Sequence, residues 1–487
     1  MPAFLRNFSR NRSLSVSVTA LAALMSLAAI FVNCGGSGSM MPMPGAAMGT
    51  INVSITDPPS CRFPNGSFQH VFVTIRSVQA HINPNADDST PGWQELVPTL
   101  NNQPMQIDLF AAASTACLLT TLGSNTALPA GTYQQIRLIL LANDGGNGPL
   151  PAMNACADQG FNCVVLQDGS IHELQLSSQA NNGLKILPGI TVAAGQDVDL
   201  DIDFNACSSI RREGNGKFRL KPVLRAMEVS TNRTGISGQV VDAATRAPIS
   251  GGTVLVALEQ QDNSGVDVIL MQTAADSAGN FNFCPLPAPA TFDVVVVAIN
   301  GTGVAYNATI PVGVPGGTAL GAIPLAAETG NSKGPATLQG FVTATTGSSP
   351  ATIDASLIAL QTITLSGGVM RPVTIPSESN STPNISVDSN SACPVTAPLN
   401  TNCAQYTLIK PASNPSVGVF TGGKITYARP ASGDVLYSVR SDASTAAGAS
   451  DCAQPSQTTS LDANGNLLKV SPGAIATPKE FDYSGCS

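Results

Sequence analysis

The sequence predicts an all-β fold built from tandem β-sandwich domains, and three observations lead to this prediction. The chain of 487 residues contains 45 glycines and 35 prolines, as expected for short strands joined by many turns. Only 11% of its residues are charged, so its polar surface must come mainly from Ser, Thr, Asn and Gln. Several segments alternate apolar and polar residues, which is the period of a half-buried strand. The length suggests about three domains.

The alternation is clearest near the start of the first predicted domain. Ile51, Val53 and Ile55 fall on one face of an extended segment, and polar residues fall on the other. Similar patterns predict strands over 70–78, 133–141, 198–204 and 218–226. Clusters of Pro, Gly and Asn separate these segments, as turns do.

The N-terminal segment predicts export. Arg6, Arg10 and Arg12 precede an apolar run over residues 14–32 that contains no charge. A basic head followed by an apolar core is typical of an export signal. The alternative is an uncleaved membrane anchor, because the apolar run is just long enough to span a bilayer. Either arrangement places the remaining chain outside the cytoplasm.

Cys34 follows the apolar run and is itself followed by a Gly- and Ser-rich stretch. This placement resembles the lipobox of bacterial lipoproteins. The resemblance implies that residues 1–33 are a signal peptide, that Cys34 is acylated, and that 34–48 form a flexible tether. Asn33 departs from the usual small residue before the cleavage point. We therefore expect an exported chain, lipid-anchored to the cell envelope at the outer membrane or cell surface, with the membrane as its first partner.

Cysteine usage agrees with export. There are eleven cysteines, and setting Cys34 apart leaves an even number in a compartment that permits disulfides. The sequence leaves the connectivity open, and no Cys or His spacing suggests zinc. The bridges favoured by proximity in the chain join Cys156 to Cys163, Cys393 to Cys403, and Cys452 to Cys486.

The first predicted domain, residues 49–231, carries a family resemblance. The segments that carry the resemblance are 54–59, 106–110, 128–138, 183–186, 199–204 and 220–224. In this order they resemble domain-of-unknown-function family 4382, which implies a β-rich module of bacterial exported lipoproteins. The family implies no established ligand or reaction, and the insert around Cys156 and Cys163 departs from it.

Two further domains are predicted. Residues 234–327 resemble the carboxypeptidase regulatory-like, transthyretin-type sandwich, through the segments 236–242, 245–254 and 276–283. That resemblance implies a spacer or binding platform within a carbohydrate-binding-like fold group. Residues 336–487 form a C-terminal β-rich domain in which 377–402, rich in Ser, Asn, Thr and Pro, is expected to be a long exposed loop.

One strand carries a row of carboxylates: Asp197, Asp199, Asp201 and Asp203. Their spacing of two places all four on one face of the strand. Four like charges in a row repel, so something must neutralise them. Calcium is one candidate, since it prefers oxygen ligands. The favoured alternative is an ion-pair ladder to the next strand along the chain, through Lys217, Arg219 and Lys221. Apart from this calcium alternative, we expect no cofactor.

Other candidate sites are few. Trp93, the single tryptophan, follows a polar loop and is a candidate for stacking on a ligand. The alternative is that it packs inward. The histidines His70, His81 and His172 accompany no nucleophile-elbow motif, so we expect no catalytic residues and no enzyme.

These features predict a non-catalytic, lipid-anchored surface protein that binds carbohydrate or mediates adhesion. Its partners would be a glycan or a matrix or envelope protein. A structural spacer in an envelope assembly is the second interpretation, and a secreted hydrolase with spatially assembled carboxylates is the third. The net charge of −8 and pI of about 4.9 argue against nucleic acid, which needs clustered Lys and Arg.

Overall fold

The computed structural model describes residues 47–486 with interruptions, and strands make up almost all of its regular structure. The residues left undescribed within that range are 57–61, 64–65, 88, 110–119, 147, 177–182, 187–188, 205, 213–216, 221–223, 230–234, 285, 287–289, 330–331, 366, 379, 392, 395–396, 398–399, 429–431, 446–447 and 450–451. The helical elements described are the 3-10 turn η1 (Pro98–Asn101) and the short α2 (Ala206–Ser209). The predicted all-β class is confirmed.

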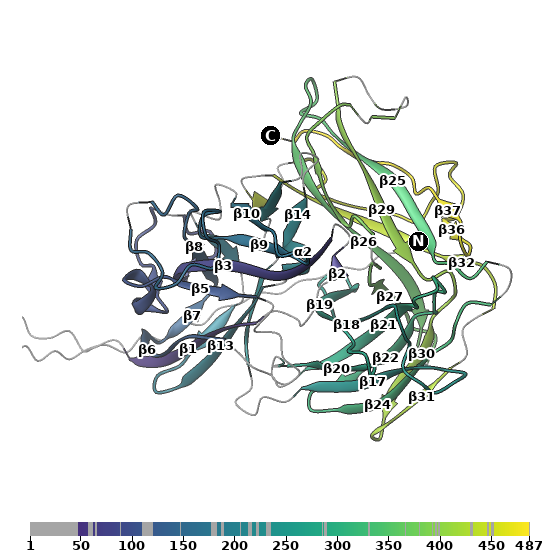
Figure 1. Cartoon of the computed structure of the whole chain (residues 1–487), viewed down its shortest axis with the longest axis horizontal. Helices are drawn as coiled ribbons and strands as arrows, with labels where there is room; N and C mark the ends of the chain where they lie inside the picture. Colours follow the sequence, from purple (N-terminus) through teal and green to yellow (C-terminus); the bar gives the residue numbers. More distant parts are fainter. Residues whose placement is uncertain are drawn as a thin grey trace, which may run out of the picture. The chain divides into compact units, whose positions relative to one another are not determined.

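Two sheets enclose the core of the first segment, residues 48–229 (Figure 1). The smaller sheet has the order β16-β13-β1-β6. Its strands are β1 (Met48–Thr56), β6 (Thr120–Pro129), β13 (Asp197–Phe204) and β16 (Leu224–Glu228).

The larger sheet of this segment has the main order β11-β8-β3-β9-β10-β15-β14, with β2, β4 and β5 also paired to β3. Its strands are β2 (Arg62–Phe63), β3 (Gly66–His81), β4 (Gln94–Glu95), β5 (Met105–Asp108), β8 (Gln135–Leu140), β9 (Cys163–Leu166), β10 (Ile171–Leu176), β11 (Leu184–Ile186), β14 (Ile210–Arg212) and β15 (Phe218–Leu220). A separate pair joins β7 (Gly131–Tyr133) to β12 (Ile190–Val192).

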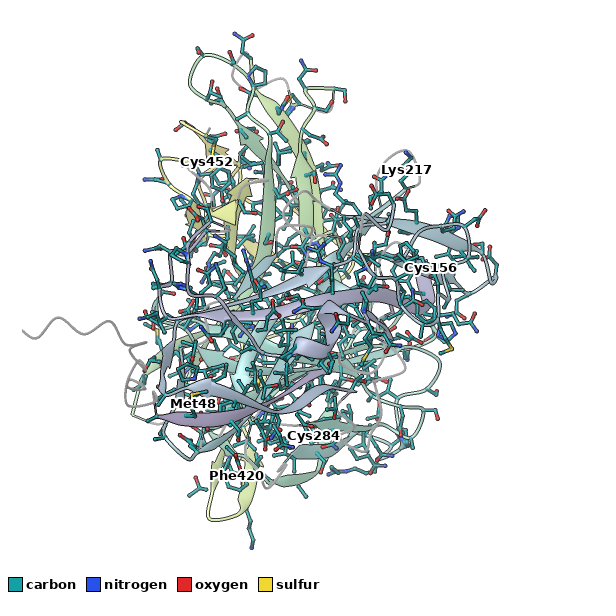
Figure 2. The ribbon with its side chains drawn as sticks, turned by 90° about the vertical axis from the view of Figure 1, so that its left-hand side faces the viewer. Met48, Cys156, Lys217, Cys284, Phe420 and Cys452 are labelled. Atoms are coloured by element: carbon teal, nitrogen blue, oxygen red, sulfur yellow. A yellow bond between two sulfur atoms is a disulfide. The ribbon has the colours of Figure 1, made fainter. Side chains whose placement is uncertain are left out.

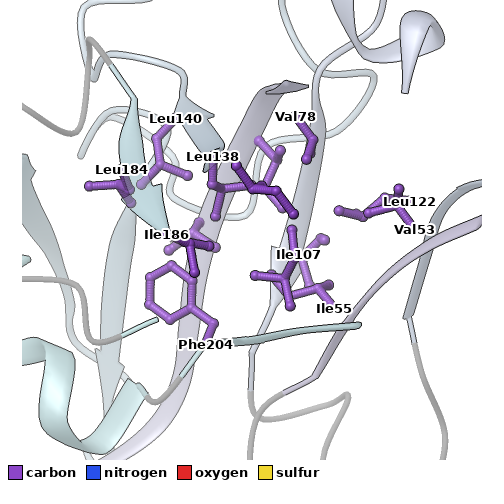
Figure 3. Close-up of a cluster of buried hydrophobic side chains, with 14 of the residues drawn as sticks. Val53, Ile55, Val78, Ile107, Leu122, Leu138, Leu140, Leu184, Ile186 and Phe204 are labelled. Atoms are coloured by element: carbon purple, nitrogen blue, oxygen red, sulfur yellow. The ribbon is translucent and has the colours of Figure 1, made fainter. Parts of the chain in front are cut away.

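The predicted alternation on β1 is confirmed. Ile51, Val53 and Ile55 are buried, while the polar residues between them remain half-buried. In Figure 3, Val53 and Ile55 of the smaller sheet converge with Ile107 and Leu138 of the larger one. This apolar interdigitation, removed from water, is what holds the two sheets together.

The second segment begins with a three-stranded sheet of order β20-β17-β24. Its strands are β17 (Ile236–Asp242), β20 (Asn280–Phe283) and β24 (Ala319–Leu325). This sheet packs on one face of a thirteen-stranded sheet through the apolar core that contains Val240, Phe281 and Phe283.

The thirteen-stranded sheet has the main order β31-β30-β22-β21-β18-β19-β27-β26-β33-β34, with β23, β28 and β35 paired at its side. The strands before residue 330 are β18 (Thr253–Gln261), β19 (Asp267–Ala274), β21 (Thr291–Ile299), β22 (Thr309–Val312) and β23 (Val314–Pro315). Those after it are β26 (Ile353–Thr364), β27 (Met370–Ile375), β28 (Asn384–Val387), β30 (Ser416–Thr421), β31 (Lys424–Tyr427), β33 (Ser438–Thr445), β34 (Gly448–Ala449) and β35 (Ser456–Thr459).

A smaller sheet covers the other face and joins β29 (Asn402–Lys410), β25 (Ala336–Ala344), β37 (Ile475–Ala476) and β38 (Phe481–Tyr483). The remaining pair is β32 (Val435–Leu436) with β36 (Lys469–Val470). The core on this face takes Leu255 and Val295 from the second predicted domain and Leu338 and Tyr406 from the third. One sheet and one core therefore draw on both predicted units, and their independence as domains stays a prediction.

The expectation of a long exposed loop over 377–402 is wrong for its first part, up to residue 387, whereas the described residues of 388–401 form no strand. The segment contains β28, and Glu378, Ser381, Ile385 and Val387 are all buried. The prediction took the polar composition as a sign of exposure, but hydroxyl and amide groups of this stretch form hydrogen bonds with neighbouring backbone. The Ser381 hydroxyl, for instance, accepts a hydrogen bond from the Ile409 amide at 2.9 Å.

The part of the chain that the structure describes contains no helix of the length and apolarity needed to cross a membrane. The predicted signal, residues 1–33, and Cys34 lie outside the described residues.

Candidate functional site

The aspartate row lies on β13, in the middle of the smaller sheet of the first segment. β13 pairs in parallel with β1, from Thr50 opposite Asp197 to Thr56 opposite Asp203, and antiparallel with β16. The predicted ladder to Lys217, Arg219 and Lys221 is therefore wrong. β15, which follows Lys217 in the chain, belongs to the larger sheet and pairs with β10 and β14. Lys221 lies outside the described residues.

Polar residues of β1 take the place of the expected cations. The Asn52 side-chain amide donates to Asp199 Oδ1 at 2.8 Å, and the Thr56 hydroxyl donates to Asp201 Oδ2 at 2.7 Å. The Thr50 hydroxyl donates to Asp197 at the exposed end of the row. Neutral hydrogen-bond donors on β1 thus stabilise three of the four carboxylates of β13.

Asp201 and Asp203 are buried, and burial dominates their titration. Loss of water raises the pKa of Asp201 to about 8, against the lowering effect of the Thr56 hydrogen bond. Burial raises the pKa of Asp203 to about 7, although the Arg225 charge opposes this shift. One carboxylate oxygen of each has no hydrogen-bond partner in the described structure. Near neutral pH both side chains hold protons for much of the time.

The described structure does not gather these carboxylates into a metal site, and the calcium alternative stays a prediction. Side chains two apart on a strand stand about 7 Å from each other, whereas Ca²⁺ binds its oxygens at about 2.3–2.6 Å. Within the described ranges, no group of three or more His, Cys, Asp or Glu side chains is placed to hold a metal ion.

Trp93 is half-buried and held by its neighbours. Its indole N–H donates to the Asp87 carbonyl oxygen at 2.9 Å, and the Arg137 guanidinium carbon lies 3.9 Å from the ring centroid. His81 contacts the ring at a centroid distance of 5.1 Å. These contacts favour the inward-packing alternative, since Arg137 already covers part of the ring as a cation–π partner.

The histidines make local contacts. His70 Nδ1 lies 2.6 Å from Asp108 Oδ2. His81 Nδ1 accepts the Asn83 amide at 2.9 Å, and its Nε2 lies 3.1 Å from the Pro91 carbonyl oxygen. His172 Nε2 lies 3.0 Å from the Ser170 hydroxyl, which donates to Asp168 in the turn between β9 and β10. Each arrangement orders a turn or a strand end.

The three expected disulfides are all present. Cys156 and Cys452, one from each of two bridges, are labelled in Figure 2. Cys284, for which no pairing was predicted, is also disulfide-bonded. The bridges join Cys156 to Cys163, Cys393 to Cys403, and Cys452 to Cys486.

A buried group of charged residues, which the sequence did not single out, joins four strands of the thirteen-stranded sheet to β29 of the smaller sheet that covers it. We call it the charge cluster, and it consists of Glu259 (β18), Asp267 (β19), Asp293 (β21), Arg371 (β27), Glu378 and Lys410 (β29). All of its members except Arg371 are at most 5% exposed. The members lie far apart in the sequence, but a signal exists: Glu259 directly follows an apolar run in β18, and Asp293 directly precedes one in β21.

Arg371 connects two carboxylates of the charge cluster. Its Nη1 lies 2.6 Å from Asp293 Oδ2 and 3.5 Å from Asp267 Oδ2. Burial, followed by the neighbouring Asp293, raises the pKa of Asp267 to about 7. Burial and the Asp267 charge raise the pKa of Glu259 well above its ordinary value. Asp267 and Glu259 therefore keep their protons at pH values at which exposed carboxyl groups have already lost theirs.

Lys410 occupies the other side of the charge cluster. Its ammonium nitrogen donates to the Ile375 carbonyl oxygen and lies 2.8 Å from the Ser377 hydroxyl oxygen. Burial lowers the pKa of Lys410 to about 7, against the raising effect of Glu378 and Glu259. Burial also raises the pKa of Glu378 to about 8, although Lys410 opposes this shift.

Comparison with known proteins identifies one family. Residues 48–222 match the family described as a domain of unknown function, DUF4382, which confirms the resemblance for that segment. No curated protein matches the sequence of the chain.

Solved structures give only remote likenesses. The shaft pilin SpaA of Lactobacillus rhamnosus GG is 11% identical, with 58% of this chain and 98% of that chain covered and a TM-score of 0.18. The minor pilin GBS52 of Streptococcus agalactiae is 9% identical, with coverages of 52% and 95% and a TM-score of 0.17. A third protein, from Bacteroides ovatus and provisionally described as an adhesin, is 11% identical. The coverages are 50% of this chain and 88% of that chain, and the TM-score is 0.14. At these TM-scores the likenesses carry no argument about function.

Proposed function

We propose that the chain is a non-catalytic surface protein, exported and anchored to the cell envelope through an acylated Cys34. The observation that carries this proposal is the set of disulfide bridges in a chain whose cysteine count becomes even once Cys34 is set apart. Bridges of this kind persist in oxidising compartments outside the cytoplasm. The outer membrane or the cell surface is the proposed location.

We further propose that the β-sandwich segments act as an adhesion module that binds glycan or an envelope protein. Support comes from the low share of charged residues in the sequence, 11%, and from the sandwich that β17, β20 and β24 form with the large sheet. The transthyretin-type assignment of residues 234–327 belongs to this proposal. The function needs no cofactor.

Binding is tested with the exported chain purified with its disulfides intact and applied to a glycan array. The adhesion proposal expects saturable binding to a defined glycan class. If Trp93 lies at that site, Trp93→Ala weakens the binding at least tenfold, and Trp93→Phe, which keeps an aromatic face, weakens it less. Absence of binding to every glycan and to isolated envelope would favour the alternative, a structural spacer.

One observation favours a hydrolase as a second candidate. Lys410, buried and with a pKa lowered to about 7, lies 2.8 Å from the hydroxyl of the half-buried Ser377. A lysine beside a serine can act as its general base in the fraction of molecules in which the lysine is neutral. Labelling of Ser377 by a fluorophosphonate probe, lost in Ser377→Ala and in Lys410→Met, would support it. An unlabelled protein would leave the contact as a structural hydrogen bond.

A further inference from the structure

The thirteen-stranded sheet has a seam between β19 and β27, where strands from before and after residue 330 meet. The two strands pair in parallel through Asp267 and Val373. By contrast, β18 and β19 pair from Leu255 through Gln261. Because the backbone contributes so little at this seam, side chains must supply much of its stability.

Side chains of the charge cluster cross the seam. The Thr374 hydroxyl of β27 donates to the Asp267 carbonyl oxygen at 2.7 Å, and the Thr374 amide donates to Glu259 Oε2 at 3.2 Å. The Arg371 guanidinium of β27 reaches Asp293 at 2.6 Å, two strands beyond β19. The seam is therefore closed by hydrogen bonds to the Asp267 backbone and the Glu259 carboxyl group, and by the ion pair between Arg371 and Asp293.

The balance of charge at the seam favours bound protons. The cations of the cluster are Arg371 and Lys410. They interact with the carboxyl groups of Glu259, Asp267 and Asp293, and Lys410 interacts with Glu378 as well. Four carboxyl groups thus face two cations in surroundings that exclude water. Glu259 lies directly opposite Asp293 across the sheet, so two ionised forms would repel each other at short range.

We propose that the charge cluster is a pH-dependent switch, which keeps the β19–β27 seam closed while Glu259 and Asp267 retain their protons and loosens it when they ionise. The pKa of each group is raised in the folded chain by burial. Such a carboxyl group contributes stability below its ordinary pKa, and this contribution is lost as pH rises through the folded value, about 7 for Asp267.

Lys410 acts in a separate pH range. Its pKa is lowered to about 7, so its contribution is full only above its ordinary pKa of 10.5 and declines as pH falls to about 7. Between about pH 5 and pH 7 the unfolded chain keeps this lysine protonated, while the folded chain begins to release the proton near pH 7, which raises stability. A loss of stability over this interval therefore comes from the carboxyl groups.

Hydrogen exchange of the full exported chain, read by mass spectrometry at pH 5.0 and pH 7.0, tests the switch. After correction for intrinsic exchange, we expect protection of amides in β19 and β27 to fall at least tenfold between these two values, because both lie between the ordinary pKa of Asp267, 3.8, and its folded value of about 7. Asp267→Asn and Glu259→Gln, which imitate the protonated groups, should each reduce that fall while leaving protection at pH 5.0 unchanged.

Asp434→Asn is the matched control, because Asp434 is an exposed carboxylate paired with Lys469 away from the charge cluster. It should retain the full pH response at the seam. Equal protection at both pH values in the unsubstituted chain would overturn the proposal. An undiminished response in both Asp267→Asn and Glu259→Gln would overturn it as well.

Discussion

At the scale of single residues, environment rather than residue type decides what a carboxyl group does. Asp197 and Asp201 lie on one face of one strand, yet the first is exposed and the second is buried with a pKa raised to about 8. The shared face follows from a spacing of two and was predictable. The burial was not, because it depends on β1 and β16.

Asp201→Asn should change stability in a pH-dependent way. The asparagine oxygen can still accept the Thr56 hydroxyl, and the buried ionisable group is removed. Because a raised pKa means stability that is lost as pH rises toward 8, the variant should gain on the order of 1 kcal/mol at pH 8.5 and little at pH 5. Urea unfolding at both pH values measures this. A gain of the same size from Asp197→Asn, at the exposed end of the row, would contradict the assignment to burial.

At the scale of strands, local pattern and long-range pairing differ in how far sequence predicts them. The alternation of Ile51, Val53 and Ile55 is a property of the segment, and it is confirmed. The partner of β13 is not local: β1 precedes it by about 147 positions. The wrong ladder to Lys217 assumed a hairpin with the following strand, whereas the chain places β13 beside β1 and β16.

The three disulfides were predictable because each joins cysteines that are near in sequence. The stability that each bridge adds should increase with the number of residues in the loop that it closes. Cys393–Cys403 spans 10 residues and Cys452–Cys486 spans 34. In the loop-entropy account, the longer bridge stabilises the fold by about 1 kcal/mol more. Replacing both cysteines of each pair with alanine and comparing free energies of unfolding tests this. Equal losses would favour enthalpic effects of the bridges over loop closure.

At the scale of the whole molecule, composition predicted the fold class, and the charge cluster shows what composition misses. Few charges, many turn residues and alternating strands describe a β-sandwich protein, as observed. The meeting of Glu259, Asp267, Arg371 and Lys410 depends on four different strands from two predicted domains. No spacing in the sequence encodes such a meeting, although an acid next to an apolar run, as at Glu259 and Asp293, indicates where to look.

The central claim, that the protein is anchored to the envelope through Cys34, is tested most directly by Cys34→Ser with membrane fractionation and metabolic labelling by a fatty acid. The unsubstituted chain should incorporate label and sediment with membranes. The variant should incorporate none and should leave the membrane fraction in high salt. A variant that stays membrane-bound with its N-terminal segment uncleaved would contradict the lipid anchor and identify residues 14–32 as a membrane-spanning one.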